Sequence, residues 1–236
     1  MKSYIWTLPT RLFHLLLAIS FTVAYFLADF DNLKNLHFAF GVFVGVIIFF
    51  RLFFGFFGPK YSHFHDFHIG MGHQIEFFKT FFDKTKVYAG HNPAASFVMI
   101  CIFIVGIGCS ISGYLLYANE NNVLNFSIGK EALKEAHEIT AHLFLVLVLV
   151  HLLGVVVDLI FHSKYETLKS IFTGYKNIEN VSVELNGFQK YFSIIWLILP
   201  FICFYLALGL HTKKQDKGNH KSEKTEQLDE DDEDDD

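Results

Sequence analysis

Two histidines lie in one long apolar segment at a spacing that places them on one helical face. His137 and His151 are 14 residues apart. In an α-helix that interval returns to within about 40° of the same direction and rises roughly 21 Å. The rise covers most of a hydrocarbon core of roughly 30 Å. Ligand-type side chains inside a membrane are costly and are therefore candidates for function. One helix thus offers two imidazoles, one near each membrane surface.

Two further histidines can face this pair. His14 follows the start of the first apolar segment, and His37 follows the start of the second. Because successive spans run in opposite directions, His14 is expected at the depth of His151 and His37 at the depth of His137. Two matched pairs predict two haems stacked across the bilayer, each with two axial imidazoles. A bis-histidine haem has no open axial position, which favours electron transfer over oxygen binding. His142 is excluded, since it points about 140° from His137 and about 180° from His151.

Two arginines are expected beside the haem between His14 and His151. Arg51 follows His37 by 14 residues, so it reaches the opposite membrane surface on the same helical face. Arg11 precedes His14 by three residues and shares its face. We therefore predict that Arg11 and Arg51 pair with haem propionates.

Two glycines are expected where a porphyrin edge passes a helix. Gly41 follows His37 by about one turn, and Gly113 lies near the end of the third apolar segment. Gly41 and Gly45 also form a small-xxx-small pattern, which is as typical of plain helix packing as of a cofactor site.

The elements that must position these residues are membrane helices. The chain has 236 residues, of which 52% are hydrophobic and 18% charged, which is more apolar than an ordinary soluble domain. Because a hydrocarbon core cannot hydrate a bare peptide group, each apolar block is expected to be a helix. The fourth helix is expected to begin earlier than its block, near Ala132. The five blocks are Leu8 to Ala28, Leu36 to Phe57, Ala94 to Ala118, Ile139 to Val157 and Phe192 to Leu210. The expected fold is an all-α integral membrane bundle with a four-helix core and a fifth C-terminal transmembrane helix.

The distribution of Lys and Arg predicts the orientation. With a cytoplasmic N-terminus, eleven Lys and Arg residues fall on the inner side and three on the outer side before the tail. The first span is interpreted as retained rather than as a signal peptide, because no small-residue cleavage site follows it. Eight acidic residues, 229–236, end the chain. We expect the polar tail to be disordered. It is either a solvated extension or a segment that attracts a basic partner electrostatically.

Several motifs together make the chain resemble the bacterial cytochrome b561 and nickel-iron-hydrogenase-type b cytochrome family. The resemblance covers nearly all of residues 4–178. Its opening helix carries Trp6 to His14, and its fourth carries His137 and His151. The other matching motifs are Leu36-His37 with Gly41, Arg51 to Pro59, Gly90-His91-Asn92-Pro93-Ala94-Ala95, Ser112-Gly113-Tyr114 and Thr173-Gly174-Tyr175-Lys176.

The resemblance implies two non-covalent haems b, each held by two histidines, and electron exchange with membrane quinone. It implies a multi-pass protein of the bacterial inner membrane that works in respiratory electron transport. We expect a haem-binding domain at 1–178, an additional transmembrane helix at 190–211 and a disordered acidic tail at 212–236. The expected redox partner is a periplasmic cytochrome c or an oxidoreductase subunit. The lipid bilayer surrounds the chain, and no nucleic-acid partner is expected.

Two alternatives stay open at this point. The chain could be the haem-bearing anchor subunit of a hydrogenase or dehydrogenase, so whether it acts as part of a quinol-linked oxidoreductase is undecided. It could instead be a haem-free metal or ion transporter that uses the histidines of the spans together with the loop histidines His63, His65, His68 and His73. A covalent c-type haem is not expected, because the sequence contains no C-x-x-C-H.

Overall fold

The computed structural model describes residues 2–83, 86–121, 123 and 129–209, and long helices dominate it. The last of these, which we call the C-terminal helix, spans Gly187–Gly209. The preceding elements are β1 (Ser3–Tyr4), α1 (Leu8–Leu27), a 3-10 turn (Asp31–Leu33), α2 (Lys34–Phe57), a 3-10 turn (Phe64–Asp66), α3 (Met71–Lys79), α4 (Pro93–Glu120), α5 (Lys130–His162), a 3-10 turn (Ser163–Tyr165), α6 (Thr167–Thr173) and β2 (Tyr175–Lys176).

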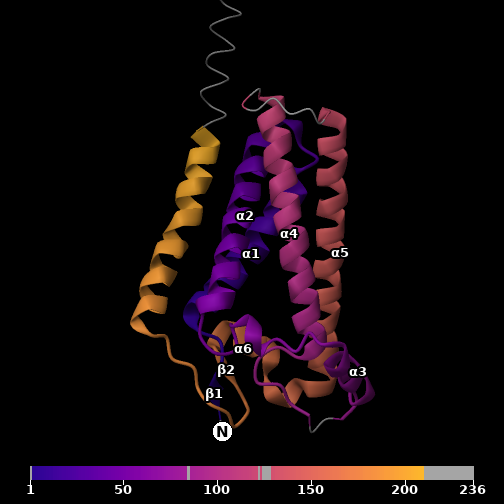
Figure 1. Ribbon diagram of the computed structural model, residues 1–236, viewed down its shortest axis with the longest axis vertical. Helices are drawn as coiled ribbons and strands as arrows, with labels where there is room; N and C mark the ends of the chain where they lie inside the picture. The colour runs from indigo at the N-terminus through magenta and orange to yellow at the C-terminus, as the bar shows by residue number, and fades with distance from the viewer. Residues whose placement is uncertain (1, 84–85, 122, 124–128, 210–236) are drawn as a thin grey trace, which may run out of the picture.

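Within the described residues, five helices are long and apolar enough to cross a membrane. They are α1, α2, α4, α5 and the C-terminal helix, and they stand side by side in Figure 1. The predicted all-α membrane bundle is therefore confirmed. The helices extend beyond several of the apolar blocks, because a helix continues past the hydrocarbon core while its own backbone bonds remain satisfied. The fifth span begins a few residues earlier than expected, at Gly187.

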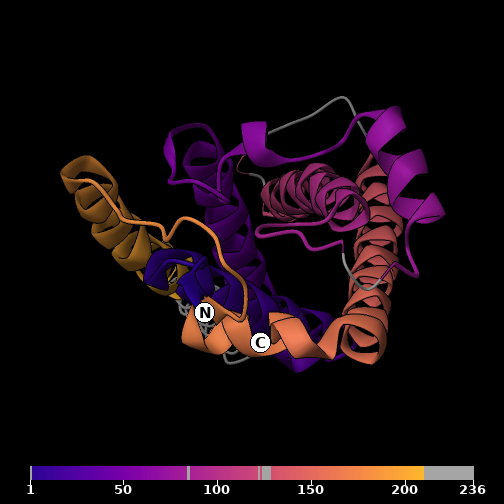
Figure 2. The same cartoon turned by 90° about the horizontal axis from the view of Figure 1, so that it is seen from below.

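Helix α2 is the centre of the packing. On one side, Phe43, Phe50 and Phe54 pack with Phe13 of α1 and against the C-terminal helix through residues such as Trp196. On the other side, its apolar residues pack against α4 and α5. Seen from below, the C-terminal helix lies at one side of the bundle and α5 at the other (Figure 2). The C-terminal helix is thus added to the outside of the four-helix arrangement.

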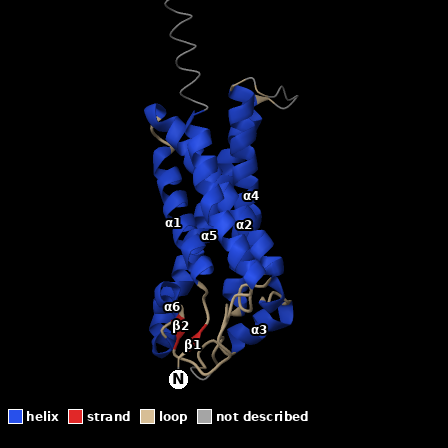
Figure 3. Ribbon diagram, turned by 90° about the vertical axis from the view of Figure 1, so that its left-hand side faces the viewer, coloured by secondary structure: helices blue, strands red, loops and turns tan. Residues whose placement is uncertain are grey.

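One end of the bundle carries a compact cap built from the loops. We call this the lower end, because it lies at the bottom of Figure 1, and the opposite end the upper end. Strands β1 and β2 pair antiparallel there, with Ser3 opposite Lys176, and α3 and α6 lie at the same end (Figure 3). The indole N–H of Trp6 donates to Ser170 Oγ at 3.1 Å, which ties the segment between β1 and α1 to α6. Gly174 ends α6 with φ +87°, a left-handed conformation that favours glycine.

The expected acidic tail, 212–236, lies outside the described residues. The same is true of the last residues of the expected 190–211 span, beyond Gly209. The division into a domain at 1–178, a further helix and a tail stays a prediction.

Candidate functional site

The structure brings four histidines together as two pairs. His14 of α1 faces His151 of α5, with ring centroids 6.2 Å apart and planes at 57°. His37 of α2 faces His137 of α5, with centroids 6.0 Å apart and planes at 83°. We call these the lower pair and the upper pair. Helix α5 contributes one ring to each, because 14 residues bring its side chains back to nearly the same face.

The separation within each pair suits one metal atom between two imidazoles. An imidazole nitrogen binds a transition metal at about 2 Å, and the ring centroid lies about 1 Å behind that nitrogen. Two axial imidazoles on opposite sides of one atom therefore have centroids about 6 Å apart. The lower and upper pairs, at 6.2 and 6.0 Å, both match this spacing. The donor set thus fits a haem iron at each pair, while ligation itself stays a prediction.

The two rings of the upper pair are oriented by backbone carbonyls. His37 Nδ1 lies 2.8 Å from the carbonyl oxygen of Ala24, and His137 Nδ1 lies 3.1 Å from that of Cys109. A carbonyl oxygen only accepts, so each Nδ1 must carry the proton and donate. This leaves the Nε2 lone pair of each ring for a metal, which is the usual arrangement of metal-binding histidines. The hydroxyl of Ser112 is also near this ring, with its Oγ 3.3 Å from His137 Nδ1.

The two predicted glycines have different surroundings. A Cβ on Gly113 would lie 2.8 Å from Cε1 of His137, so the absence of a side chain lets that ring lie against α4. Gly113 therefore contacts the histidine itself rather than leaving a space beside it. A Cβ on Gly41 would meet no atom of the described residues within 4 Å. Gly41 thus borders open space on the helix that carries His37.

The two predicted arginines differ in their partners. Arg11 donates from Nη1 to the carbonyl oxygen of Phe172. The guanidinium of Arg51 is buried, and within the described residues neither its Nη1 nor its Nη2 has a hydrogen-bond partner. The Nε atom of Arg11 is likewise buried without a partner there, so the two arginines differ at Nη1, which is bonded in Arg11 and unpaired in Arg51.

Two residues near the lower pair have no predicted role from the sequence. His91 lies in the loop before α4, and its pKa is held well below the ordinary value by burial and then by Arg51, Lys176, His151 and His14. Lys176 lies in β2 with its side chain almost completely buried. His91 belongs to the motif Gly90 to Ala95, and Lys176 belongs to the motif Thr173 to Lys176. These motifs carry the family resemblance, and they are the feature of the sequence that could have marked both residues as functional.

The other histidines do not join the two pairs. His142, excluded by its helical position, is exposed, and its Nδ1 lies 2.7 Å from the carbonyl oxygen of Glu138. The rings of His68, in the loop before α3, and His73, on α3, are 5.3 Å apart. Among the described residues, no group of three or more His, Cys, Asp or Glu side chains is arranged to hold a metal ion.

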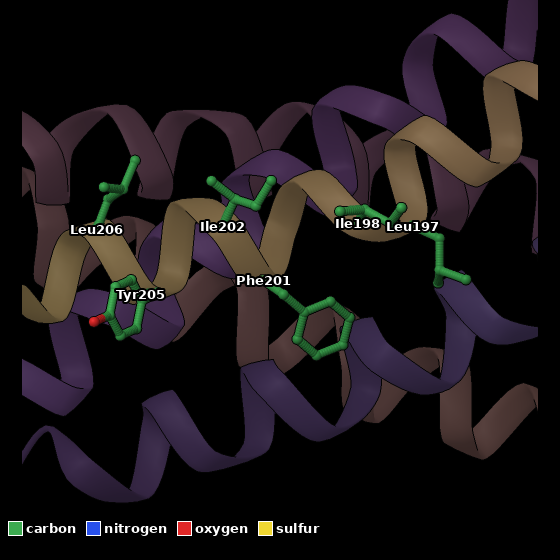
Figure 4. Close-up of a pocket in the computed structure, with 6 residues that line it drawn as sticks. All are labelled: Leu197, Ile198, Phe201, Ile202, Tyr205 and Leu206. Carbon is green, nitrogen blue, oxygen red and sulfur yellow. The ribbon is translucent and has the colours of Figure 1, made fainter.

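A groove of about 470 Å³ lies on the C-terminal helix, away from the histidine pairs (Figure 4). Tyr205 is the only polar side chain among the six that line it, the others being Leu197, Ile198, Phe201, Ile202 and Leu206. Such a surface suits contact with lipid, and it offers no ligand for a metal. The histidine pairs, rather than this groove, are the candidate site.

Comparison with known proteins gives two matches. The family described as prokaryotic cytochrome b561 matches residues 5–174, which include all four paired histidines. A protein of Azotobacter vinelandii named "Probable Ni/Fe-hydrogenase B-type cytochrome subunit" is 28% identical over 143 residues, covering 49% of this chain and 59% of that protein. The chain thus covers less than two thirds of this relative's length. No solved structure matches the chain.

Proposed function

This chain belongs to the prokaryotic cytochrome b561 family, and on that premise we propose that it is a diheme electron carrier of the bacterial inner membrane. Membership of a b-type cytochrome family implies haem b and membrane electron transfer. The proposal adds that two haems b are bound, one by His14 with His151 and one by His37 with His137. Electrons pass between membrane quinone and a redox partner, such as a periplasmic cytochrome c or an oxidoreductase subunit.

The observation that carries the proposal is the spacing of the two histidine pairs. Ring centroids at 6.2 and 6.0 Å fit two axial imidazoles around one metal atom. Haem b supplies a one-electron couple of its iron when it is bound. With two imidazoles to hold each haem iron, the pairs would leave no open position on it for oxygen or another small ligand. Haem chemistry is also favoured over a haem-free transporter, which the family does not support.

The remaining residues of the site hold and orient these groups. The carbonyl groups of Ala24 and Cys109 fix the rings of the upper pair, and Gly113 provides room for His137. Arg11 and Arg51 are assigned to propionates of the haem at the lower pair. The apolar side chains of the helices exclude water around the site, which contributes to the reduction potential.

The orientation follows from the excess of Lys and Arg at the lower end. With that end in the cytoplasm, eleven of these residues face the inner side and three the outer side. The proposal therefore places the N-terminus and the cap in the cytoplasm. Residues 1–178 form the haem-binding domain, with the C-terminal helix as an addition at its side.

A second candidate function is suggested by the relative's name. The protein of Azotobacter vinelandii is named as a hydrogenase subunit, so this chain could be the haem-bearing anchor of a hydrogenase or dehydrogenase. Purification from its native membrane in mild detergent separates the two candidates. A stoichiometric iron–sulfur or nickel protein that co-purifies supports the anchor, and a chain that purifies alone supports the independent carrier.

The haem content of the purified full-length chain tests the proposal. A pyridine haemochrome assay should give two haems b per chain, and a reduced-minus-oxidised spectrum should show both as six-coordinate low-spin centres. Fewer than two haems per folded chain would overturn the two-haem proposal. A colourless protein from haem-replete cells would overturn the assignment of haem altogether.

A further inference from the structure

The lower end of the bundle contains a buried positive charge that no acidic side chain among the described residues neutralises. Arg51 is 8% exposed, and its guanidinium lies among the rings of Phe64, Phe67 and Phe103 at 5.6, 5.9 and 5.5 Å from their centroids. Such contacts stabilise a cation through the ring faces but accept none of its N–H groups as a carboxylate would. Its Nη1 and Nη2 have no hydrogen-bond partner among the described residues. Five N–H donors in a planar fork suit a carboxylate or phosphate.

A second buried cation lies nearby in the cap. Lys176 is 3% exposed, and its Nζ donates to the carbonyl oxygens of Tyr88 at 3.3 Å and Gly90 at 3.1 Å. Burial lowers the pKa of Lys176 to about 8, although Asp158 acts in the opposite direction. Within the described part of the chain, neither Lys176 nor Arg51 forms an ion pair with an acidic side chain. A buried charge without a partner is costly unless a ligand supplies one.

His91 lies between the two cations. Its ring packs on Trp6 at 4.7 Å and on Phe67 at 5.1 Å between centroids. Lys176 Nζ lies over the same Trp6 ring at 5.6 Å, and Arg51 lies over the same Phe67 ring at 5.9 Å. The Nδ1 atom of His91 is buried without a hydrogen-bond partner in the described structure.

This cluster adjoins the lower histidine pair. After burial, the causes that lower the pKa of His91 are the nearby side chains of Arg51, Lys176, His151 and His14. Arg51 and Lys176 come from a span and from a strand that are 125 positions apart in the sequence, and His91 comes from a third segment. Two cations and a polar ring therefore converge beside the place that the proposed function gives to one haem.

We infer that Arg51, His91 and Lys176 form an anion-binding site for the propionate carboxylates of the haem between His14 and His151. This inference rests on the proposed function and names residues that hold its cofactor. Two carboxylates match two cations in charge, and each buried guanidinium or ammonium group can donate charge-assisted hydrogen bonds to them. His91 contributes a neutral N–H donor. Arg11 can add a donor to the same carboxylates, but it is only partly buried, so its charge depends less on a bound anion than the charges of Arg51 and Lys176 do.

The inference can be tested by changing the ligand instead of the protein. Protohaem dimethyl ester keeps the iron and its axial chemistry but replaces both carboxylates with neutral esters. We would titrate the full-length apoprotein in detergent with protohaem and with the ester, using the His37→Ala variant so that only the lower pair binds. The expected result is an affinity for protohaem on the order of tenfold or more above that for the ester.

Substitutions then identify the residues responsible. Arg51→Gln and Lys176→Met should each lower the protohaem affinity toward that of the ester and leave the ester affinity unchanged. Lys164→Met is the matched control, because Lys164 is an exposed lysine in the same end of the molecule, and it should retain the full preference for protohaem. If a variant fails to fold, the comparison of the two porphyrins on the His37→Ala protein still shows whether the carboxylates contribute to binding.

Three different results would overturn either the anion-binding inference or the proposed function, and each result can be told apart from the others. Equal affinities for protohaem and its ester would overturn the anion-binding inference and leave the haem proposal intact. The site would instead belong to a lipid phosphate if the two affinities are equal and phosphatidylglycerol co-purifies with the parent protein but not with Arg51→Gln. Uptake of neither porphyrin by the folded protein would overturn the proposed function itself.

Discussion

The Nδ1 atom of His37 on α2 lies 2.8 Å from the carbonyl oxygen of Ala24 on α1. This contact joins two neighbouring spans and fixes the ring so that its other nitrogen is available toward His137. His137 has a corresponding contact with Cys109 on α4. The upper pair is thus oriented by backbone atoms of two helices that carry no member of that pair, which prepares both rings before a metal binds.

Loss of single histidines should remove single haems. His151→Ala should lose only the haem of the lower pair, and His37→Ala only that of the upper pair, since each removes one of two axial ligands. A pyridine haemochrome assay should give about one haem per chain for each variant, and the double variant should give none. His142→Ala is the control and should keep both haems, because His142 is exposed and outside both pairs. Loss of the same haem in both single variants would contradict the pairing.

Gly113→Ala should displace His137. Its Cβ would lie 2.8 Å from Cε1 of a ring that is also held by Cys109, so the ring cannot keep its position. We expect loss of the upper haem or a change of its low-spin signal in electron paramagnetic resonance. Gly108→Ala on the same helix is the control, because its Cβ would make only an ordinary contact of 3.9 Å with Thr140. An unchanged upper signal in Gly113→Ala would show that this close approach is not needed.

Gly41→Ala tests where the porphyrin edge passes. No atom of the described structure lies within 4 Å of the added Cβ, and Ala is favoured over Gly inside a helix by about 1 kcal/mol. The apoprotein should therefore fold at least as well as the parent. If the porphyrin of the upper pair passes Gly41, haem occupancy at that pair should fall, as measured by absorbance per chain. Full occupancy with normal spectra would remove Gly41 from the cofactor-binding residues.

The affinity of the lower site for protohaem should depend on pH through Lys176. Because burial lowers the pKa of Lys176 to about 8, the apoprotein loses this charge as the pH rises above about 8. A bound carboxylate favours the protonated amine, so binding above that pH takes up a proton and weakens. Between pH 7 and 9.5 the affinity of the His37→Ala protein should fall on the order of tenfold.

Lys176→Arg separates this effect from other changes at high pH. A guanidinium stays protonated across this pH range, so the variant should lose the part of the pH dependence that comes from Lys176. Arg51 is present in both proteins, and His91 stays neutral throughout, because burial and the nearby cations hold its pKa well below the ordinary value. Identical pH profiles for the parent and Lys176→Arg would contradict the assignment of Lys176.

The sequence by itself determined the spans and the depth of the four histidines. Both follow from local rules, since a helix has a fixed rise and rotation per residue and a bilayer has a fixed thickness. The same rules excluded His142. The all-α membrane bundle and the family were therefore predictable before any contact between helices was known, whereas haem ligation by the pairs stays a prediction.

Only the tertiary structure decided how the lower end is assembled. Pairing of Ser3 with Lys176 and the bond from Trp6 to Ser170 close loops of more than 160 residues, and no helical period relates such positions. These contacts bring Lys176 and His91 toward Arg51. Motif membership marked His91 and Lys176 in the sequence, but their convergence on one buried positive site depends on long-range packing of the cap, which local periodicity does not specify.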